Sequence, residues 1–219
     1  MAPHNPFANS ETAAGYEAWY QTVGCRADQQ EKALLKRLLN SFPLAETLLD
    51  VGCGTGHFAR WFGEHGLQVV GLDLSRPMLG EAKSLGGPVC VQGDALRLPF
   101  LSRSFDLTAL ITTLEFLPNL VQALAEALRV ARQGLILGVL NAQSRLGWQY
   151  KREGGPIWEA AHFLTPHELR QMLRESAGEE VKVFWRTALW PHRPVSLPLP
   201  WGGFIGMAVK LSAVARRER

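Results

Sequence analysis

The sequence predicts an α/β fold in which helices wrap a mostly parallel sheet. Short apolar runs alternate with amphipathic helical segments along the chain, a pattern typical of strands joined by crossover helices. One apolar run, 47–51, leads directly into a turn with glycines at 52, 54 and 56. Glycine permits the positive φ angles of a tight turn, and the helix that follows offers unpaired N–H groups to an anionic ligand.

The composition is that of one ordinary domain. The chain has 219 residues, of which 47% are hydrophobic and 20% charged, enough for a sizeable core. A net charge of +3 is too small to indicate a nucleic-acid partner. Cys25, Cys53 and Cys90 lack metal-site or paired spacing, so neither zinc nor a disulfide framework is expected. No signal peptide or stretch of 18 apolar residues is visible, which favours a cytoplasmic protein without a membrane span.

Hydrophobic spacing sets the elements of the first half. Leu34, Leu35 and Leu38 share one helical face, and Ser75 suits the N-cap of a helix with Pro77 in its first turn. In chain order we expect a helix over 28–42, a strand over 47–51, a helix from His57 to about His65, a strand over 68–72, and a helix reaching about Ser84.

The second half continues the alternation and then changes character. Residues 142–163 are rich in aromatics and glycines but show little periodicity. Thr165 and Glu168 form a capping box that starts a helix ending near Gly178. In chain order we expect strands over 88–92 and 105–111, a helix over 120–131, a strand over 134–140, and after that helix two strands over 180–190 and 203–212, which form an antiparallel hairpin at the sheet edge.

The glycine spacing narrows the ligand class. A dinucleotide fingerprint would need glycine at position 57, which is histidine, and no Gly-Lys-Ser/Thr follows as in a P-loop. The remaining pattern, with Asp50 two residues before the first glycine, resembles the first motif of class I S-adenosylmethionine-dependent methyltransferases. The resemblance implies that Asp50 complements the cofactor's ammonium and that its methionine end lies against Gly52, Cys53, Gly54 and Gly56.

Two more acids follow the next strands, at the edge where open α/β sheets bind ligands. Asp73 matches the family's ribose-binding position, where one carboxylate accepts two hydroxyl hydrogen bonds. Asp94 and Ala95 resemble the family's adenine motif, and Leu74 and Met78 are expected to contact the rings. Taken singly, such a loop acid can instead cap a helix or face water.

The stretch 104–118 resembles the strand-four motif of the type 11 methyltransferases and places Thr112 at the cofactor. The similarity covers about 45–141 and implies a Rossmann-like, doubly wound, seven-stranded, mostly parallel sheet with an antiparallel C-terminal strand. We therefore expect one domain, comprising an N-terminal cap and first helix over 1–44, a cofactor-binding core over 45–141, and an acceptor-side and hairpin region over 142–219.

The two ends of the chain are expected to build the acceptor side. Tyr16, followed by Trp19 and Tyr20, is expected to reach the methionine carboxylate, or else these aromatics pack on the sheet edge. Glu115 and His162 are the catalytic candidates: Glu115 to orient the acceptor or contact the cofactor amine, and His162 as a general base. The alternatives are a cap for Glu115 and a surface position for His162.

The function indicated is methyl transfer from S-adenosylmethionine to a small-molecule acceptor, mainly by proximity and orientation, with S-adenosylhomocysteine as product. An RNA or protein methyltransferase is an alternative, although residues 113–116 lack the Asn/Asp-Pro-Pro-Tyr pattern of amino-directed DNA enzymes. A non-catalytic relative that only binds the cofactor also stays open. A nicotinamide dehydrogenase is excluded by the glycine spacing.

Overall fold

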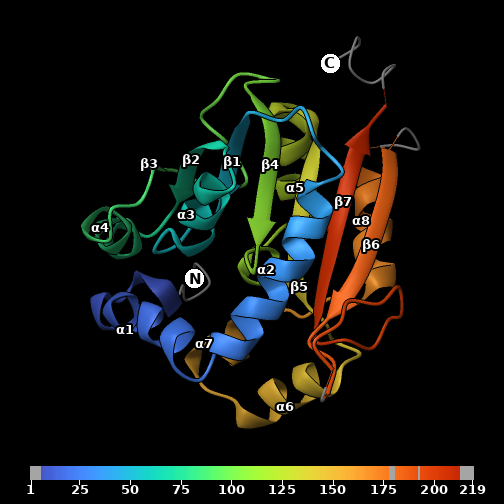
Figure 1. The fold of residues 1–219 in the computed structure, drawn as a ribbon. Coiled ribbons are helices and arrows are strands. Elements are labelled where there is room, and N and C mark those ends of the chain that lie inside the picture. Colours follow the sequence, from blue (N-terminus) through green and yellow to red (C-terminus); the bar gives the residue numbers. More distant parts are fainter. Residues whose placement is uncertain (1–5, 178–180, 192, 213–219) are drawn as a thin grey trace.

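A seven-stranded sheet with helices on both faces forms the body of the molecule (Figure 1). It is seen in a computed structural model that describes residues 6–177, 181–191 and 193–212. The strand order is β3-β2-β1-β4-β5-β7-β6. Neighbours from β3 to β5 pair in parallel, and β7 pairs antiparallel with both β5 and β6, which confirms the predicted fold. The strands are β1 (Thr47–Val51), β2 (Gln68–Asp73), β3 (Val89–Gln92), β4 (Phe105–Ile111), β5 (Ala131–Leu140), β6 (Val181–Ala188) and β7 (Phe204–Leu211).

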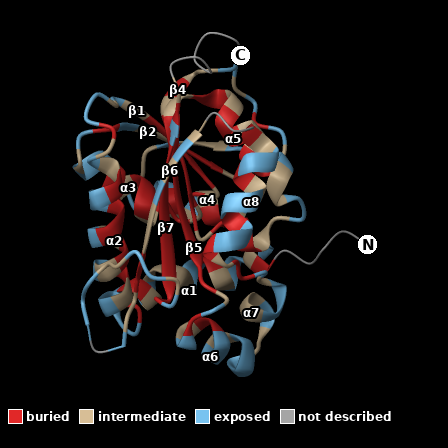
Figure 2. Ribbon diagram, turned by 90° about the vertical axis from the view of Figure 1, so that its right-hand side faces the viewer, coloured by how far each residue is buried: buried red, intermediate tan, exposed pale blue. Residues whose placement is uncertain are grey.

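Two layers of helices cover the sheet, and buried residues concentrate between the layers (Figure 2). Helices α2 and α3 pack on one face through Leu34, Leu38 and Phe62, whereas α5 and α8 pack on the other through apolar positions such as Leu124 and Leu173. The helices are α1 (Ser10–Gln21), α2 (Cys25–Leu39), α3 (His57–Glu64), α4 (Arg76–Ser84), α5 (Leu120–Val130), α6 (Arg145–Glu153), α7 (Pro156–Ala160) and α8 (Pro166–Ala177), with short 3₁₀ turns η1 (Pro6–Ala8) and η2 (Leu114–Phe116).

The central strands are buried on both sides, which explains their continuous apolar runs. Five consecutive residues of β4, from Leu107 to Ile111, are buried, as is the C-terminal part of β5. Gly206 on β7 faces Leu34 and Leu38 of α2 so closely that a side chain there would meet them at 2.8–3.0 Å. The glycine therefore lets α2 lie directly on the sheet.

Most of the predicted elements are confirmed, and the differences lie at the two ends. The capping box before α8 forms as expected, since Thr165 Oγ1 accepts from Glu168 N and the Glu168 carboxylate accepts from Thr165 N. The expected end of that helix, Gly178, lies outside the described residues. Helix α6, which begins at its N-cap Ser144, was not predicted because Gly147 is its only buried residue. Helices α7 and α1 were likewise not predicted.

The unpredicted helices matter because of where they lie. Helices α1, α6 and α7 gather near the carboxyl ends of the parallel strands, in the lower part of Figure 1. The N-terminal turn η1 contacts α1, α4 and α7, so the N-terminal segment meets the segment that follows β5 at this edge. Within the described residues, no helix has both the length and the apolarity needed to cross a bilayer.

Gly134→Ala is expected to destabilise the protein by about 1–3 kcal/mol, because the new Cβ would overlap the carbonyl oxygen of Val209 and crowd the ring of Phe42. Gly63→Ala, in α3, is the matched control: a Cβ there meets nothing within 4 Å and should stabilise the helix by about 0.5–1 kcal/mol. Urea unfolding midpoints measure both. A Gly134→Ala protein as stable as the wild type would show that β5 and β7 are not packed as described.

Candidate active site

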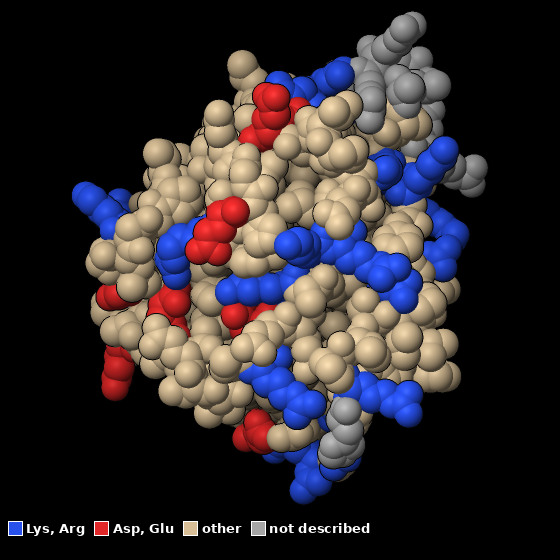
Figure 3. Space-filling view, viewed as in Figure 1, with Lys and Arg blue, Asp and Glu red and all other residues tan. Residues whose placement is uncertain are grey.

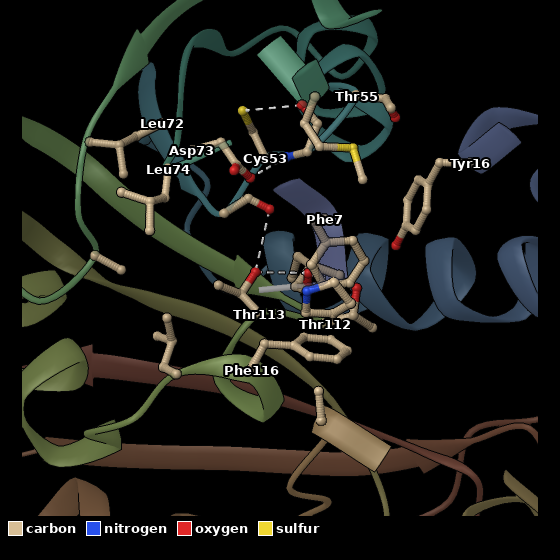
Figure 4. A pocket seen from close by; sticks show the side chains of 18 of the residues that line it. Phe7, Tyr16, Cys53, Thr55, Leu72, Asp73, Leu74, Thr112, Thr113 and Phe116 are labelled. Atoms are coloured by element: carbon tan, nitrogen blue, oxygen red, sulfur yellow. Dashed lines mark hydrogen bonds between the residues drawn. The ribbon is translucent and has the colours of Figure 1, made fainter. Parts of the chain in front are cut away.

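A cavity of about 900 Å³ opens at the carboxyl edge of the sheet, where open α/β folds bind ligands. The turns after β1, β2, β3 and β4 form one wall, and η1, α1 and the start of α7 form the other (Figure 4). Segments from the beginning, middle and later part of the chain therefore share one site.

The glycine turn after β1 has the backbone conformation that its sequence predicts. Gly52, Gly54 and Gly56 have φ angles of +74°, +52° and +78°. The N–H groups of Gly52 and Cys53 both donate to Leu72 O of the neighbouring strand, at 2.7 and 3.0 Å. A Cβ at Gly52 would overlap Thr113, whereas a Cβ at Gly54 would meet nothing within 4 Å. Gly52 thus serves packing, and Gly54 leaves open space in the cavity.

Asp73 is fixed at the end of β2 by the backbone. Its Oδ2 accepts from Gly54 N and its Oδ1 from Ser75 N, each at 2.8 Å. Burial raises the pKa of Asp73, and these backbone hydrogen bonds partly oppose that rise. Each carboxylate oxygen keeps a second lone pair for a ligand hydroxyl.

The cavity brings together most of the residues expected at the cofactor. Asp94 lies at the mouth, where its Oδ1 accepts from Leu96 N at 2.9 Å, while Met78 is buried in the wall. The expected residues that line the cavity are Tyr16, Gly52, Cys53, Gly54, Asp73, Leu74, Met78, Asp94, Ala95 and Thr112.

Two expected cofactor residues lie behind the wall instead. Gly56 is the N-cap of α3 and does not line the cavity. Asp50 is 2% exposed, and its carboxylate has no hydrogen bond within the described part of the chain. Burial, with the nearby charge of Asp73, raises the pKa of Asp50 to about 7. Asp50 can therefore act on a ligand's positive charge only through space, from beneath the turn.

The end of β4 is strained and tied to the glycine turn. Thr112 has φ of +48°, a conformation that is costly for a β-branched residue. Its backbone N–H donates to Gly138 O at 2.7 Å. Thr113 Oγ1 donates to Val51 O at 3.1 Å, and so connects β4 to β1. Strain of this kind persists where the surrounding structure holds it, often at a binding site.

Three aromatic rings meet at one end of the cavity lining and are called here the aromatic wall: Phe7 of η1, Tyr16 of α1 and Phe116 of η2. Phe7 meets Phe116 edge to face, with centroids 4.8 Å apart, and meets Tyr16 in the same way at 6.0 Å (Figure 4). Burial raises the pKa of Tyr16, and the charges of Glu31, Glu115 and Asp73 add to the rise. The phenol of Tyr16 is therefore neutral at physiological pH.

Helix α1 is held onto the glycine turn by a partly buried ionic network. His57 stacks on Tyr20 with centroids 3.6 Å apart. Its Nε2 lies 2.7 Å from Asp28 Oδ1, and its Nδ1 lies 3.5 Å from Glu17 Oε2. Glu17 also pairs with Arg60 and accepts from Thr55 Oγ1 at 2.8 Å.

The network fixes the charge of its members. Burial alone would lower the pKa of His57, but the hydrogen bonds to Asp28 and Glu17 outweigh burial and raise it above 6.5. Burial would raise the pKa of Glu17, yet His57, Thr55 and Arg60 hold it down at about 2. Both ring nitrogens of His57 are committed to carboxylates, so His57 positions α1 rather than serving as a free base.

The structure does not bring the two catalytic candidates into the cavity. Glu115 is 1% exposed, and its Oε1 accepts from Leu140 N at 2.6 Å. Burial raises the pKa of Glu115 to about 7. The side chain of His162 is exposed, and its backbone N–H donates a hydrogen bond to Glu115 O at 2.7 Å. Neither side chain lines the cavity, because η2 turns Glu115 inward and the chain after α7 carries the His162 ring outward.

Some aromatics expected on the acceptor side are structural. The Trp19 ring fills the space beside Gly24, between α1 and α2. Trp158, which we also expected on the acceptor side because it belongs to the aromatic-rich stretch 142–163, stacks on Tyr150, with centroids 4.1 Å apart, and does not line the cavity. Conversely, Phe7 and Phe116 do line it, and only their aromatic character near predicted loops could have suggested this.

The matched families agree with this geometry. Residues 49–138 match the family described as "Methyltransferase domain". The chain is 30% identical over 178 residues to an uncharacterized protein of Methanocaldococcus jannaschii, covering 78% of this chain and 80% of that one. It is 32% identical over 189 residues to the malonyl-acyl-carrier-protein O-methyltransferase of Pseudescherichia vulneris, covering 84% and 72%. The matches to five further enzymes of that name cover only 41–54% of the length of each enzyme.

A solved structure shows the same arrangement over nearly the whole chain. It is an S-adenosylmethionine-dependent methyltransferase from Thermotoga maritima, described as a possible histamine N-methyltransferase. The two chains are 27% identical with a TM-score of 0.78, and the match covers 93% of this chain and 98% of the other.

His57→Gln is expected to lower the free energy of unfolding by about 1.5–3 kcal/mol at pH 5.5, because it leaves Glu17 and Asp28 without their shared cation. Since the folded pKa of His57 is raised, this stabilisation is complete below about pH 6.5 and is lost as pH rises through the raised value. Urea unfolding at several pH values measures it, with the exposed His167→Gln as control. An equal loss at pH 5.5 and pH 9 would show that packing, not charge, holds His57.

Proposed function

Because this chain belongs to the class I S-adenosylmethionine-dependent methyltransferases, we propose that it methylates a small-molecule acceptor bound in the carboxyl-edge cavity. S-adenosylmethionine is the cofactor and S-adenosylhomocysteine the product. The observation that carries the proposal is the cavity itself. Its 900 Å³ lies in the upper part of the range of about 300–1,000 Å³ for ligand sites, which suits a cofactor with a small co-substrate.

The residues that line the cavity support specific roles toward the cofactor. We assign the turn of Gly52, Cys53 and Gly54 to the methionine end, where Gly54 leaves room for it. We assign Asp73 to the ribose hydroxyls, and Asp94 with Ala95 to the adenine. Leu74 and Met78 supply apolar contact to the rings, while Tyr16 and Thr112 face the reacting end.

The division of the chain follows from the same geometry. We propose that residues 45–141 hold the cofactor, while 1–44 and 142–219 enclose the acceptor. In support, η1 and α1 supply Phe7 and Tyr16 to the wall, and α7 supplies Pro156 and Glu159. The sheet edge itself supplies the glycine turn and Asp73.

Catalysis by this chain rests on positioning. When bound, the cofactor supplies a methyl group on a positively charged sulfur, so its leaving group needs little assistance. Phe7, Tyr16 and Phe116 exclude water and hold the acceptor beside the cofactor, which accounts for most of the acceleration expected. A base is needed only for an acceptor that must lose a proton. Among the described residues that line the cavity, the histidine, His57, is held in an ion pair with Asp28 and is therefore not free to act as that base.

The names of the relatives support a small acceptor group without fixing the acceptor atom. The relative from Pseudescherichia vulneris is named a malonyl-acyl-carrier-protein O-methyltransferase, and the one from Thermotoga maritima is described as a possible histamine N-methyltransferase.

A macromolecular acceptor has one feature in its favour, a basic groove, but the groove lies elsewhere. Lys and Arg side chains gather over α2 and β6 in Figure 3. A groove of about 630 Å³ is lined there by Arg26, Lys36 and Arg37, among others. It shares no lining residue with the carboxyl-edge cavity. An RNA or protein held in this groove would not be placed at the cofactor, so the small acceptor is favoured.

Asp73→Ala is expected to weaken S-adenosylhomocysteine binding about 10- to 100-fold, because a carboxylate–hydroxyl pair is lost. Glu168→Ala, which removes only the capping box of α8, should leave the affinity unchanged. Isothermal titration calorimetry measures both. Equal losses would refute the ribose assignment.

Incubation with S-adenosylmethionine and a library of small amines, alcohols, thiols and carboxylic acids should release S-adenosylhomocysteine with at least one class. Mass spectrometry of the product, showing one added methyl group, checks the transfer. A protein that binds the cofactor yet methylates nothing in the library, but does methylate RNA or protein extracts, would establish the alternative acceptor. Binding without any transfer would indicate a non-catalytic relative.

A further inference from the structure

We propose that the acceptor carries a positively charged amine, and that the aromatic wall of Phe7, Tyr16 and Phe116 recognises this ammonium group. The proposal rests on the small-molecule methyltransferase function above and names the substrate class of that site. It follows from the ring geometry and from the charged side chains that line the cavity.

The three rings pack against one another and all line the cavity. Phe7 stands nearly perpendicular to both Phe116 and Tyr16, at 89° in each case, so the rings present faces and edges of different orientation. Tyr20 continues the series with its ring 5.7 Å from that of Tyr16. Aromatic faces attract a desolvated ammonium group within about 6 Å, and such cages recognise cationic ligands.

The protein offers no free cation to an anionic acceptor in the cavity. Within the described residues, no Lys or Arg lines it, and the charged side chains that do are Asp73, Asp94, Glu159 and His57. Asp73 and Asp94 are assigned above to the cofactor, and His57 is paired with Asp28 and Glu17, which leaves Glu159 as the charged group on the acceptor side. A carboxylate acceptor would therefore find no side-chain cation to pair with, which is unfavourable.

Two acidic side chains lie behind the aromatic wall, Glu31 at 4% and Glu115 at 1% exposed. Burial raises the pKa of Glu31 to about 8 and that of Glu115 to about 7. Neither is therefore a full negative charge at neutral pH, and the proposal rests on the rings and on the side chains that line the cavity.

Methylation of such an acceptor balances simply. The ammonium group first releases one proton to solvent, since a protonated amine has no lone pair. The nitrogen lone pair then forms the N–C bond, while the electron pair of the broken C–S bond stays on sulfur. The products are an N-methylammonium and S-adenosylhomocysteine.

The cofactor's own sulfonium is also positive, so the rings could serve it rather than the acceptor. Saturation with S-adenosylhomocysteine separates the two roles, because this thioether is neutral at sulfur. An ammonium preference that persists in that complex belongs to the acceptor side.

The test is calorimetric titration of the S-adenosylhomocysteine complex with three probes of matched shape: 2-phenylethylamine, 2-phenylethanol and 3-phenylpropanoate. The amine is expected to bind at least about tenfold more tightly than the other two. In Phe7→Leu and Phe116→Leu, the amine should lose this advantage. Trp148→Leu is the matched control, because Trp148 is an exposed aromatic that contacts Arg152 outside the cavity.

The proposal is overturned if the amine binds no more tightly than the alcohol and the carboxylate. It is also overturned if none of the three probes binds. Retention of the preference in both phenylalanine variants overturns its assignment to the rings. S-adenosylhomocysteine binding to each variant verifies that the fold survives. A wild-type protein that binds S-adenosylhomocysteine and methylates carboxylates would keep the methyltransferase function and refute the amine, whereas no cofactor binding would refute the function itself.

Discussion

The hydrogen bond from Gly54 N to Asp73 Oδ2, 2.8 Å long, is the constraint on which the site depends. It joins the turn after β1 to the end of β2, and the paired N–H groups that share Leu72 O hold the same turn from below. Thr113 adds the end of β4. Three strand ends thereby become one connected edge, so this side of the cavity is preorganised.

The opposite side of the cavity is built from different interactions. Helix α1 touches the glycine turn through side chains, chiefly Glu17 and its partners Thr55, Arg60 and His57. This network depends on the charge of His57, whose pKa is raised by its hydrogen bonds to Asp28 and Glu17. The sheet edge also contains a titratable group, because burial raises the pKa of Asp50, beneath the glycine turn, to about 7.

Local signals in the sequence were enough for the core. The apolar run of β4 was predicted to the residue, and the positions of Asp73 and Asp94 followed from where strands end. The features that the sequence did not predict, the position of Glu115 and the helices α6 and α7, depend on long-range packing. Glu115 was expected near the acceptor, but η2 turns it toward Leu140 N, a contact between residues 25 positions apart that no local pattern encodes. Helices α6 and α7 bury too few residues to leave a periodic signal.

The family match covers residues 49–138, whereas Phe7, Tyr16 and Pro156 reach the cavity from outside that range. Of the three rings of the aromatic wall, Phe116 alone lies within the matched range. An alignment confined to the shared core therefore leaves out the side of the cavity that η1, α1 and α7 build.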